Sequence, residues 1–179
     1  MRKFLFCIIM IFSVSSINAN SIFNTIRKWW KTMENFNECF LSGLRKFIKE
    51  NEGFSPNAYF DNDGMTVGFG HLLNPKDKIV SISEETADIL FKSDIEVVIS
   101  DYLHFFKDID SEINEVRKIA LMDMLFTLGR GDFAGFKKML RAVFKQDWDK
   151  AAYEAQHSNW YKQQYPARRD KIITMLRNG

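Results

Sequence analysis

Two acidic residues, Glu52 and Asp61, are the best candidates for chemistry in this sequence. Glu52 closes a helical pattern, because Gly53 follows it directly and glycine commonly ends a helix. Asp61 comes shortly before Asp63-Gly64, a pair of the kind that reverses a β-hairpin. Two carboxyl groups on separate rigid elements suit the cleavage of a glycosidic bond. One must be protonated to donate to the leaving oxygen, and the other must be ionised to activate water or to stabilise positive charge on the sugar.

Local patterns indicate the elements that position these acids. Strand-like runs at residues 58–61 and 65–69 flank the Asp63-Gly64 turn. Ser83 is a good N-cap for a long helix that reaches Phe106, which we expect to bridge two lobes. The helix that delivers Glu52 has apolar residues at helical spacing, namely Phe40, Leu41, Leu44, Phe47 and Ile48.

The second half of the chain is predicted to be helical. A densely apolar helix, capped by Asp110 or Ser111 and ending at Gly129, is expected at the centre of the larger lobe. Shorter helices are expected at residues 136–145, at 148–156 with Asp147 as its cap, at 159–163 with Ser158 as its cap, and from Pro166 to Leu176.

Three segments around the two acids resemble the active-site region of the phage-type lysozymes, glycoside hydrolase family 24. They are Glu52-Gly53, the spaced motif Tyr59-x-Asp61-x-x-Gly64, and the run from Thr66 to Leu73. The similarity continues in matched order through most of residues 40–178. It implies an α+β, mostly helical, lysozyme-like fold with a small β-hairpin lobe and a larger helical lobe joined by a long helix. It also implies hydrolysis of the β-1,4 bond between N-acetylmuramic acid and N-acetylglucosamine in bacterial peptidoglycan, without a cofactor.

The same resemblance assigns roles to three residues. Glu52 is expected to act as the general acid, while Asp61 and Thr66 place the attacking water. The family inverts the sugar configuration, which requires carboxyl groups about 6.5–9.5 Å apart. The chain departs from the family pattern, because one residue separates Gly64 from Thr66 where a close relative has two. A one-residue shift turns a strand side chain to the other face, so we expect the turn to absorb the change.

Arg168 matches an arginine that pairs with the catalytic glutamate across the cleft. Arg169 is the alternative if the register differs by one residue. Such a pair opposes the raised pKa that a general acid needs, so burial or substrate binding must offset the effect of the arginine on Glu52.

Other residues are expected to support the site or the core. His71 and Asp94 match a structural histidine–carboxylate pair that supports the hairpin. Leu72, in the matched run, and Thr127, which stands where a relative has a cleft-lining glutamine, are candidates for contact with substrate. The remaining notable side chains are most simply buried structural ones, namely Cys39, Phe126, Phe133, Phe144, Trp148 and Trp160.

The first residues have the pattern of a secretory signal peptide. Basic residues at positions 2 and 3 precede an apolar run at residues 4–14 and small residues at 15–19. The apolar run is shorter than the roughly 20 residues of a membrane-spanning helix. We therefore expect residues 1–19 to be removed on export across the inner membrane, to the periplasm or outside the cell. The alternative is a transient, releasable membrane anchor formed by residues 4–19.

Residues 20–37 form a separate region with apolar side chains at helical spacing and basic ones between them. We expect an amphipathic helix or linker that packs on the main body, with membrane-surface binding as the alternative. Residues 38–179 are then expected to form the lysozyme-like catalytic domain.

The composition argues against several other functions. Three histidines and two cysteines lack the spacing of a metal site, and no phosphate-binding loop or nucleic-acid motif is present in the sequence. We expect a monomer whose partner is the peptidoglycan glycan strand, with no nucleic acid. Two alternatives remain: a non-catalytic peptidoglycan-binding protein of lysozyme descent, and a lytic transglycosylase or chitinase-like enzyme on the same fold.

Overall fold

The computed structural model describes residues 36–61 and 64–179. The chain divides into two compact units, Met1–Asn37 and Glu38–Gly179. The expected signal segment at 1–19 and the amphipathic region up to residue 35 lie outside the described residues, as does Asp63 of the expected turn. Every helix and strand of the described residues belongs to the second unit.

Helix α3 (Glu38–Glu52) ends at the predicted glutamate. Gly53 adopts a φ of 71°, and its N–H donates to the Lys49 carbonyl oxygen at 3.0 Å, so this glycine ends the helix as predicted. The predicted apolar stripe is buried in full and consists of Phe40, Leu41, Leu44, Phe47 and Ile48.

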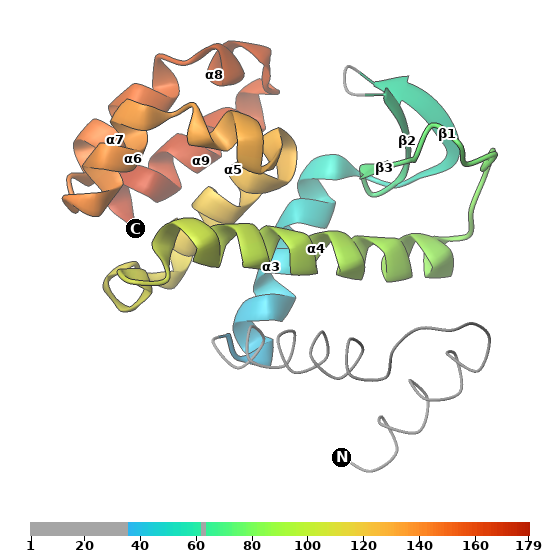
Figure 1. Ribbon diagram of the computed structural model, residues 1–179, viewed down its shortest axis with the longest axis horizontal. Helices are drawn as coiled ribbons and strands as arrows, with labels where there is room; N and C mark the ends of the chain where they lie inside the picture. Colours follow the sequence, from blue (N-terminus) through green and yellow to red (C-terminus); the bar gives the residue numbers. More distant parts are fainter. Residues whose placement is uncertain (1–35, 62–63) are drawn as a thin grey trace. The chain divides into compact units, whose positions relative to one another are not determined.

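A small antiparallel sheet follows α3 and forms the β part of the fold, in the strand order β1-β2-β3. Figure 1 shows it beside one end of α4, apart from the helical lobe. Its strands are β1 (Ser55–Asp61), β2 (Gly64–Gly68) and β3 (His71–Leu72).

The register of the hairpin places the site candidates on one face. Asp61 pairs with Gly64, Tyr59 pairs with Thr66, and Thr66 pairs on its other side with Leu72. Residues that face each other across antiparallel strands share a face, and so do residues two apart on one strand. Thr66 therefore lies on the same face as Asp61, and the shortened connection has not turned it away.

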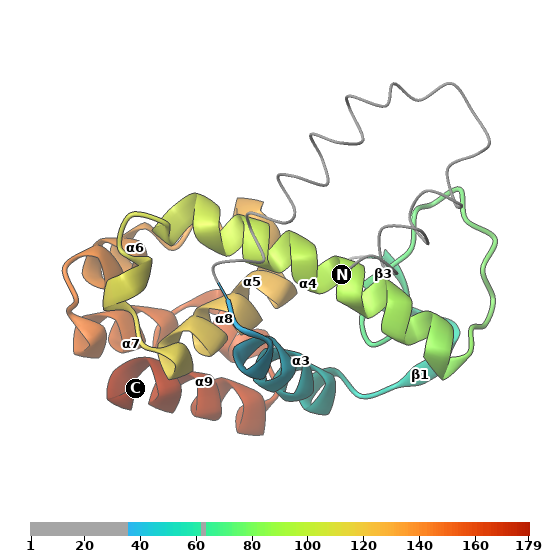
Figure 2. The ribbon, with the colours of Figure 1, turned by 90° about the horizontal axis from the view of Figure 1, so that it is seen from below.

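Helix α4 (Glu84–Phe106) joins the two lobes of this unit. It begins at the predicted cap, since the Ser83 side chain accepts a hydrogen bond from the Thr86 N–H. It packs against β2 and β3 and also against α5 (Glu115–Ala134). Figures 1 and 2 show α4 running past the sheet and on to the helical lobe, as expected for a bridging helix.

The helical lobe is built around α5. Residues 120–125 of this helix are all buried, so it is enclosed on every side, as its apolar sequence predicted. At Gly129 the backbone has φ 65° and ψ 167°, which breaks the helix at the predicted position before a last turn to Ala134. The remaining helices are α6 (Lys137–Phe144), α7 (Trp148–Gln156), α8 (Asn159–Gln163) and α9 (Pro166–Asn178). None of the helices in the described ranges is long and apolar enough to cross a membrane.

The predicted cap of α5 is wrong. Asn114 is the N-cap, and its side chain accepts from the Arg117 N–H. Asp110 lies instead in a short 3-10 turn, where its carboxylate accepts from the Tyr102 hydroxyl at 2.9 Å and pairs with Lys118 at 2.8 Å. Tyr102 of α4 and Lys118 of α5 thus occupy the Asp110 carboxylate, which was expected to cap α5.

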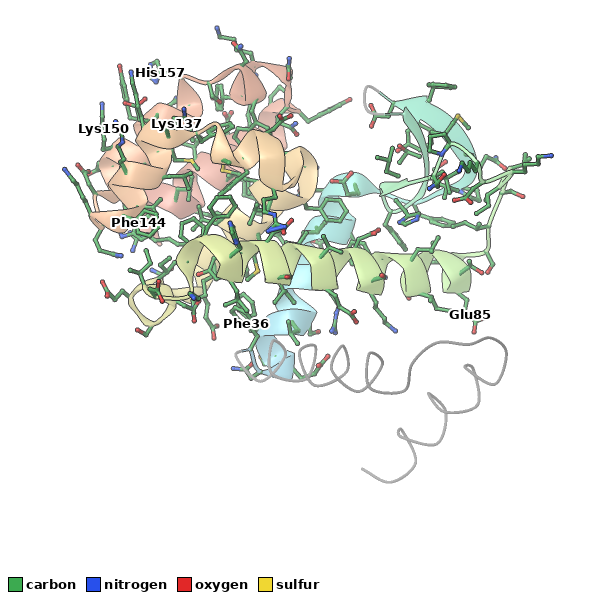
Figure 3. The ribbon with its side chains drawn as sticks, in the orientation of Figure 1. Phe36, Glu85, Lys137, Phe144, Lys150 and His157 are labelled. Atoms are coloured by element: carbon green, nitrogen blue, oxygen red, sulfur yellow. The ribbon has the colours of Figure 1, made fainter. Side chains whose placement is uncertain are left out.

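Two residues expected in the core are exposed. Phe144 is 50% exposed at the end of α6, at the edge of the helical lobe in Figure 3. Cys39 is also exposed. Its neighbours Phe40 and Leu41 belong to the buried stripe, and a helix turns the preceding side chain off that stripe. Of the other aromatics, Phe133 and Trp160 are buried, while Phe126 and Trp148 are partly exposed.

Candidate active site

Glu52 lies at the end of α3 with its carboxyl largely buried. Its side chain is 18% exposed, and Oε1 accepts a hydrogen bond from Arg168 Nη1 at 2.6 Å. Burial disfavours the charged form and raises the pKa of Glu52, although the Arg168 charge and hydrogen bond act in the opposite direction. The negative charges of Asp123 and Asp61 add to the rise. The environment therefore favours a protonated carboxyl, which is the form a general acid requires.

Arg168 reaches Glu52 from the first turn of α9 and is itself held by Asp123 of α5. Its Nε donates to Asp123 Oδ2 at 3.0 Å and its Nη2 donates to Oδ1 at 2.9 Å. The alternative residue, Arg169, points elsewhere, because its Nη1 donates to the Tyr161 carbonyl oxygen and its guanidinium lies over the Tyr161 ring. Arg168 is thus the partner of Glu52.

Asp123 is a site residue that the sequence reasoning missed. Its side chain is fully buried, and Asn51 Nδ2 donates to its Oδ1 at 3.4 Å. The only available signal was an aspartate between Met122 and Met124 in a densely apolar helix. A charged residue in such a place must be paired to be tolerated, so it points to a buried partner.

Gly70 brings the backbone close to the Glu52 carboxyl. A Cβ at this position would lie 3.1 Å from Glu52 Oε2 and 3.4 Å from a ring carbon of Phe126. Gly70 also has a φ of 84°, which side chains other than glycine rarely adopt. The sequence indicates a role for this glycine in a turn and in close strand packing, and the structure adds that it leaves room for the acid.

Asp61 lies at the end of β1 with an exposed side chain. Burial is the main cause of the raised pKa of Tyr59, and the charges of Asp61 and Glu52 contribute to it. Asp61, Tyr59 and Glu52 therefore act on one another electrostatically. Thr66 is only 5% exposed and shares the face of the hairpin that carries Asp61.

His71 and Asp94 tie the sheet to the bridging helix. His71 Nδ1 lies 2.9 Å and 3.0 Å from the two carboxylate oxygens of Asp94. Burial raises the pKa of Asp94, and the hydrogen bond and charge of His71 oppose that rise. The contact links β3 to α4. Leu72, the next residue along, is 52% exposed and lies against Gly64 on the face of the hairpin that carries Asp61.

Thr127 uses its hydroxyl within the helical lobe. Oγ1 donates to a backbone carbonyl of the preceding turn, with Met124 O at 3.1 Å, and accepts from Trp160 Nε1 at 3.1 Å. Trp160 is 4% exposed and belongs to the core, as expected. Among the described residues, no group of three or more histidine, cysteine, aspartate or glutamate side chains is arranged to hold a metal ion.

One family of known proteins matches most of this chain. Residues 49–173 match the family model described as phage lysozyme. The chain belongs to the phage lysozyme family. The matched range includes Glu52, Asp61, Thr66, Asp123 and Arg168, so all parts of the site lie within the lysozyme segment.

Individual relatives of this phage lysozyme-family chain are distant. It is 28% identical over 164 residues to the "probable T4-type lysozyme 2" of Dictyostelium discoideum, covering 78% of this chain and 96% of that protein. It is 28% identical over 160 residues to the pre-baseplate central spike protein of enterobacteria phage T4, covering 76% of this chain and 28% of the spike protein. The peptidoglycan hydrolase of Pseudomonas phage phiKMV is 28% identical over 136 residues, which are 74% of this chain and 15% of that protein.

Proposed function

We propose that this chain is a lysozyme that hydrolyses the β-1,4 bond between N-acetylmuramic acid and N-acetylglucosamine in bacterial peptidoglycan. The observation that carries the proposal is the environment of the Glu52 carboxyl. Burial raises its pKa, and a hydrogen bond from Arg168 orients it. Family membership supports hydrolysis of the lysozyme type, and the relative in phage phiKMV is named a peptidoglycan hydrolase.

In the proposed reaction Glu52 donates its proton to the oxygen that leaves. The bond between that oxygen and the sugar C1 breaks, and positive charge develops on the ring. Asp61 and Thr66 hold a water on the opposite face of the sugar. The water oxygen bonds to C1 and its proton passes to Asp61, so the product carries one added water and an inverted anomeric carbon.

Two observations favour this assignment of Asp61 and Thr66. They share one face of the β1–β2 hairpin, so a single water can be reached by both side chains. The charge of Asp61 also acts on Glu52, and two acids in different surroundings can divide the roles of acid and base. Glu52 is largely buried, whereas Asp61 is exposed.

The products distinguish this function from its alternatives. Purified peptidoglycan is digested with the protein, and the fragments are analysed by mass spectrometry. We expect muramic acid ends that each carry one added water. Fragments lighter by one water, with an anhydro end, would instead identify a lytic transglycosylase, and intact glycan with retained protein would identify a binding protein. Digestion in isotopically heavy water should place the label at the new reducing end.

We also propose that residues 1–19 direct export, with transient anchoring by residues 4–19 as the alternative. The full chain is expressed in a Gram-negative host, and the N-terminus of the recovered protein is sequenced. A periplasmic or secreted protein that begins after residue 16 or 19 is the expected result. Uncleaved protein in the membrane fraction would favour the anchor.

A further inference from the structure

Asp123 has a place in the site that the proposed reaction does not explain. Its carboxylate is fully buried, and it takes two of the three Arg168 nitrogens. The third nitrogen, Nη1, donates a hydrogen bond to Glu52. A paired hydrogen bond of this kind fixes both the position and the plane of a guanidinium group. The orientation in which Arg168 meets the acid is therefore set from α5, through the two nitrogens that Glu52 does not use.

We propose that Asp123 is a positioning residue that clamps Arg168 and balances its charge, so that Arg168 orients the Glu52 carboxyl by one hydrogen bond without drawing off its proton. This inference rests on the proposed function, in which Glu52 is the general acid. It assigns to Asp123 a role in the reaction that is exerted through Arg168 rather than by contact with the sugar.

The charge of the buried cluster supports this role. The cluster contains one cation, Arg168, and two acids, Asp123 and Glu52. It is neutral when one acid is ionised, and it carries a net negative charge when both are ionised. A net charge is costly in a site where Asp123 is fully buried and Arg168 is 8% exposed. Protonation of Glu52 therefore removes the excess negative charge of the cluster.

The two acids of the cluster differ in the hydrogen bonds that they accept. Both oxygens of Asp123 accept from Arg168, and Asn51 donates a further hydrogen bond to Oδ1. Glu52 accepts a single hydrogen bond from Arg168. Hydrogen bonds donated to a carboxylate favour its ionised form, and Glu52 receives the fewer of them, so its proton is opposed by one hydrogen bond only. In agreement with this, the nearby charge of Asp123 contributes to the raised pKa of Glu52.

Removal of the Asp123 charge should reverse this balance. Arg168 would then have Glu52 as its one charged partner, and an arginine beside a single carboxyl favours its ionised form. The acid would lose its proton at a lower pH. Asn51 offers a matched exchange, because it contacts Asp123 directly and is a neutral isostere of aspartate. The double variant Asn51→Asp/Asp123→Asn returns one carboxylate to the hydrogen-bonded pair at positions 51 and 123.

The test compares wild type, Asp123→Asn and Asn51→Asp/Asp123→Asn on purified peptidoglycan across a range of pH. The rate falls on the alkaline side where the general acid loses its proton. We expect Asp123→Asn to move this alkaline limb down by about one pH unit or more, a tenfold loss of the protonated acid at a given pH. The exchange variant should return the limb towards its wild-type position.

A carbon-13 NMR titration of the Glu52 carboxyl in the same proteins gives a readout that needs no activity. An unmoved alkaline limb and an unmoved Glu52 titration in Asp123→Asn, with the rate lowered by one factor at every pH, would reduce Asp123 to a structural residue. If Asp123→Asn does not fold, the exchange variant decides. A Glu52 pKa as high as in wild type supports the inference, and one lowered to that of an exposed glutamate overturns it. A wild type that cleaves no glycan at any pH refutes the proposed function. The titration of the Glu52 carboxyl would still show whether Asp123 raises the pKa of Glu52.

Discussion

Arg168 Nη1 donates to Glu52 Oε1 at 2.6 Å, although 116 residues separate the two in the chain. The contact joins the start of α9 to the end of α3, and Asp123 of α5 anchors it. Arg168 lowers the pKa of Glu52, but burial of the carboxyl has the larger effect and raises it. The same side chains therefore contribute both to the stability of the fold and to the proposed reaction.

Arg168→Met should destabilise the fold strongly. It leaves the carboxylate of Asp123 buried without its cation, which costs about 3–5 kcal/mol of unfolding free energy. Urea denaturation measures this loss. Arg177→Met is the matched control, because Arg177 pairs at 3.7 Å with an 88% exposed Asp149 and such surface pairs contribute about 0–1 kcal/mol. Equal losses for the two variants would contradict the buried cluster.

Glu52→Gln should become more stable relative to wild type as the pH rises. Burial raises the folded-state pKa of Glu52 above its unfolded value. The favourable contribution of this group is complete below the unfolded pKa and is lost as the pH rises through the folded pKa. Glutamine does not titrate and loses nothing. Urea denaturation of both proteins from acid to neutral pH should show a difference that grows across this window and then levels off; a constant difference would mean that the pKa is not raised.

Gly70→Ala should impair both the fold and the reaction. The positive φ costs about 1–3 kcal/mol of stability in any residue other than glycine. The new Cβ also meets Glu52 Oε2 at 3.1 Å, so the acid must shift, with an expected loss of roughly tenfold to a hundredfold in kcat. Gly43→Ala is the control, because nothing lies within 4 Å of its Cβ and alanine suits the interior of α3. A wild-type kcat in Gly70→Ala would contradict the claim that a Cβ at this position displaces the Glu52 carboxyl.

His71 and Asp94 should contribute to stability as a pair. Asp94→Asn or His71→Asn each leaves a largely buried polar partner without its hydrogen bond, which costs about 1–3 kcal/mol. The double variant should cost less than the sum of the two single changes, because the second removes a group that has already lost its partner. Thermal unfolding of the four proteins measures the coupling. Additive losses would mean that the two side chains do not stabilise the link between β3 and α4 together.

Much of the fold was predictable because its signals are local. Gly53 ends α3, and Ser83, Asp147 and Ser158 cap the helices that follow them, since each feature depends on residues a few positions away. The cap of α5 was predicted wrongly although its signal is local too, since the Asn114 side chain accepts from the Arg117 N–H three residues on. Asp110 is taken by Tyr102 and Lys118, which only the folded chain brings to it.

The site residues also divide into those that local sequence signals predict and those that depend on contacts between distant residues. The family motif located Glu52 and the hairpin, and it indicated Arg168 as a partner. Asp123 could not be found by periodicity, because its role depends on a residue 45 positions away on another helix. Phe144 shows the opposite error, since an aromatic side chain in an apolar pattern is half exposed at the edge of the lobe. Long-range contacts, rather than local propensity, decide these cases.

The most direct test of the account is the initial rate of glycan cleavage by Glu52→Gln on purified peptidoglycan. The matched control is Glu50→Gln, a change at a 57% exposed glutamate two residues earlier in α3. Loss of a general acid costs about a hundredfold or more in rate, whereas a surface change stays within about twofold. We predict that Glu50→Gln cleaves like wild type and that Glu52→Gln falls by about a hundredfold or more while remaining folded. A folded Glu52→Gln that cleaves as fast as Glu50→Gln would contradict the assignment of Glu52 as the acid.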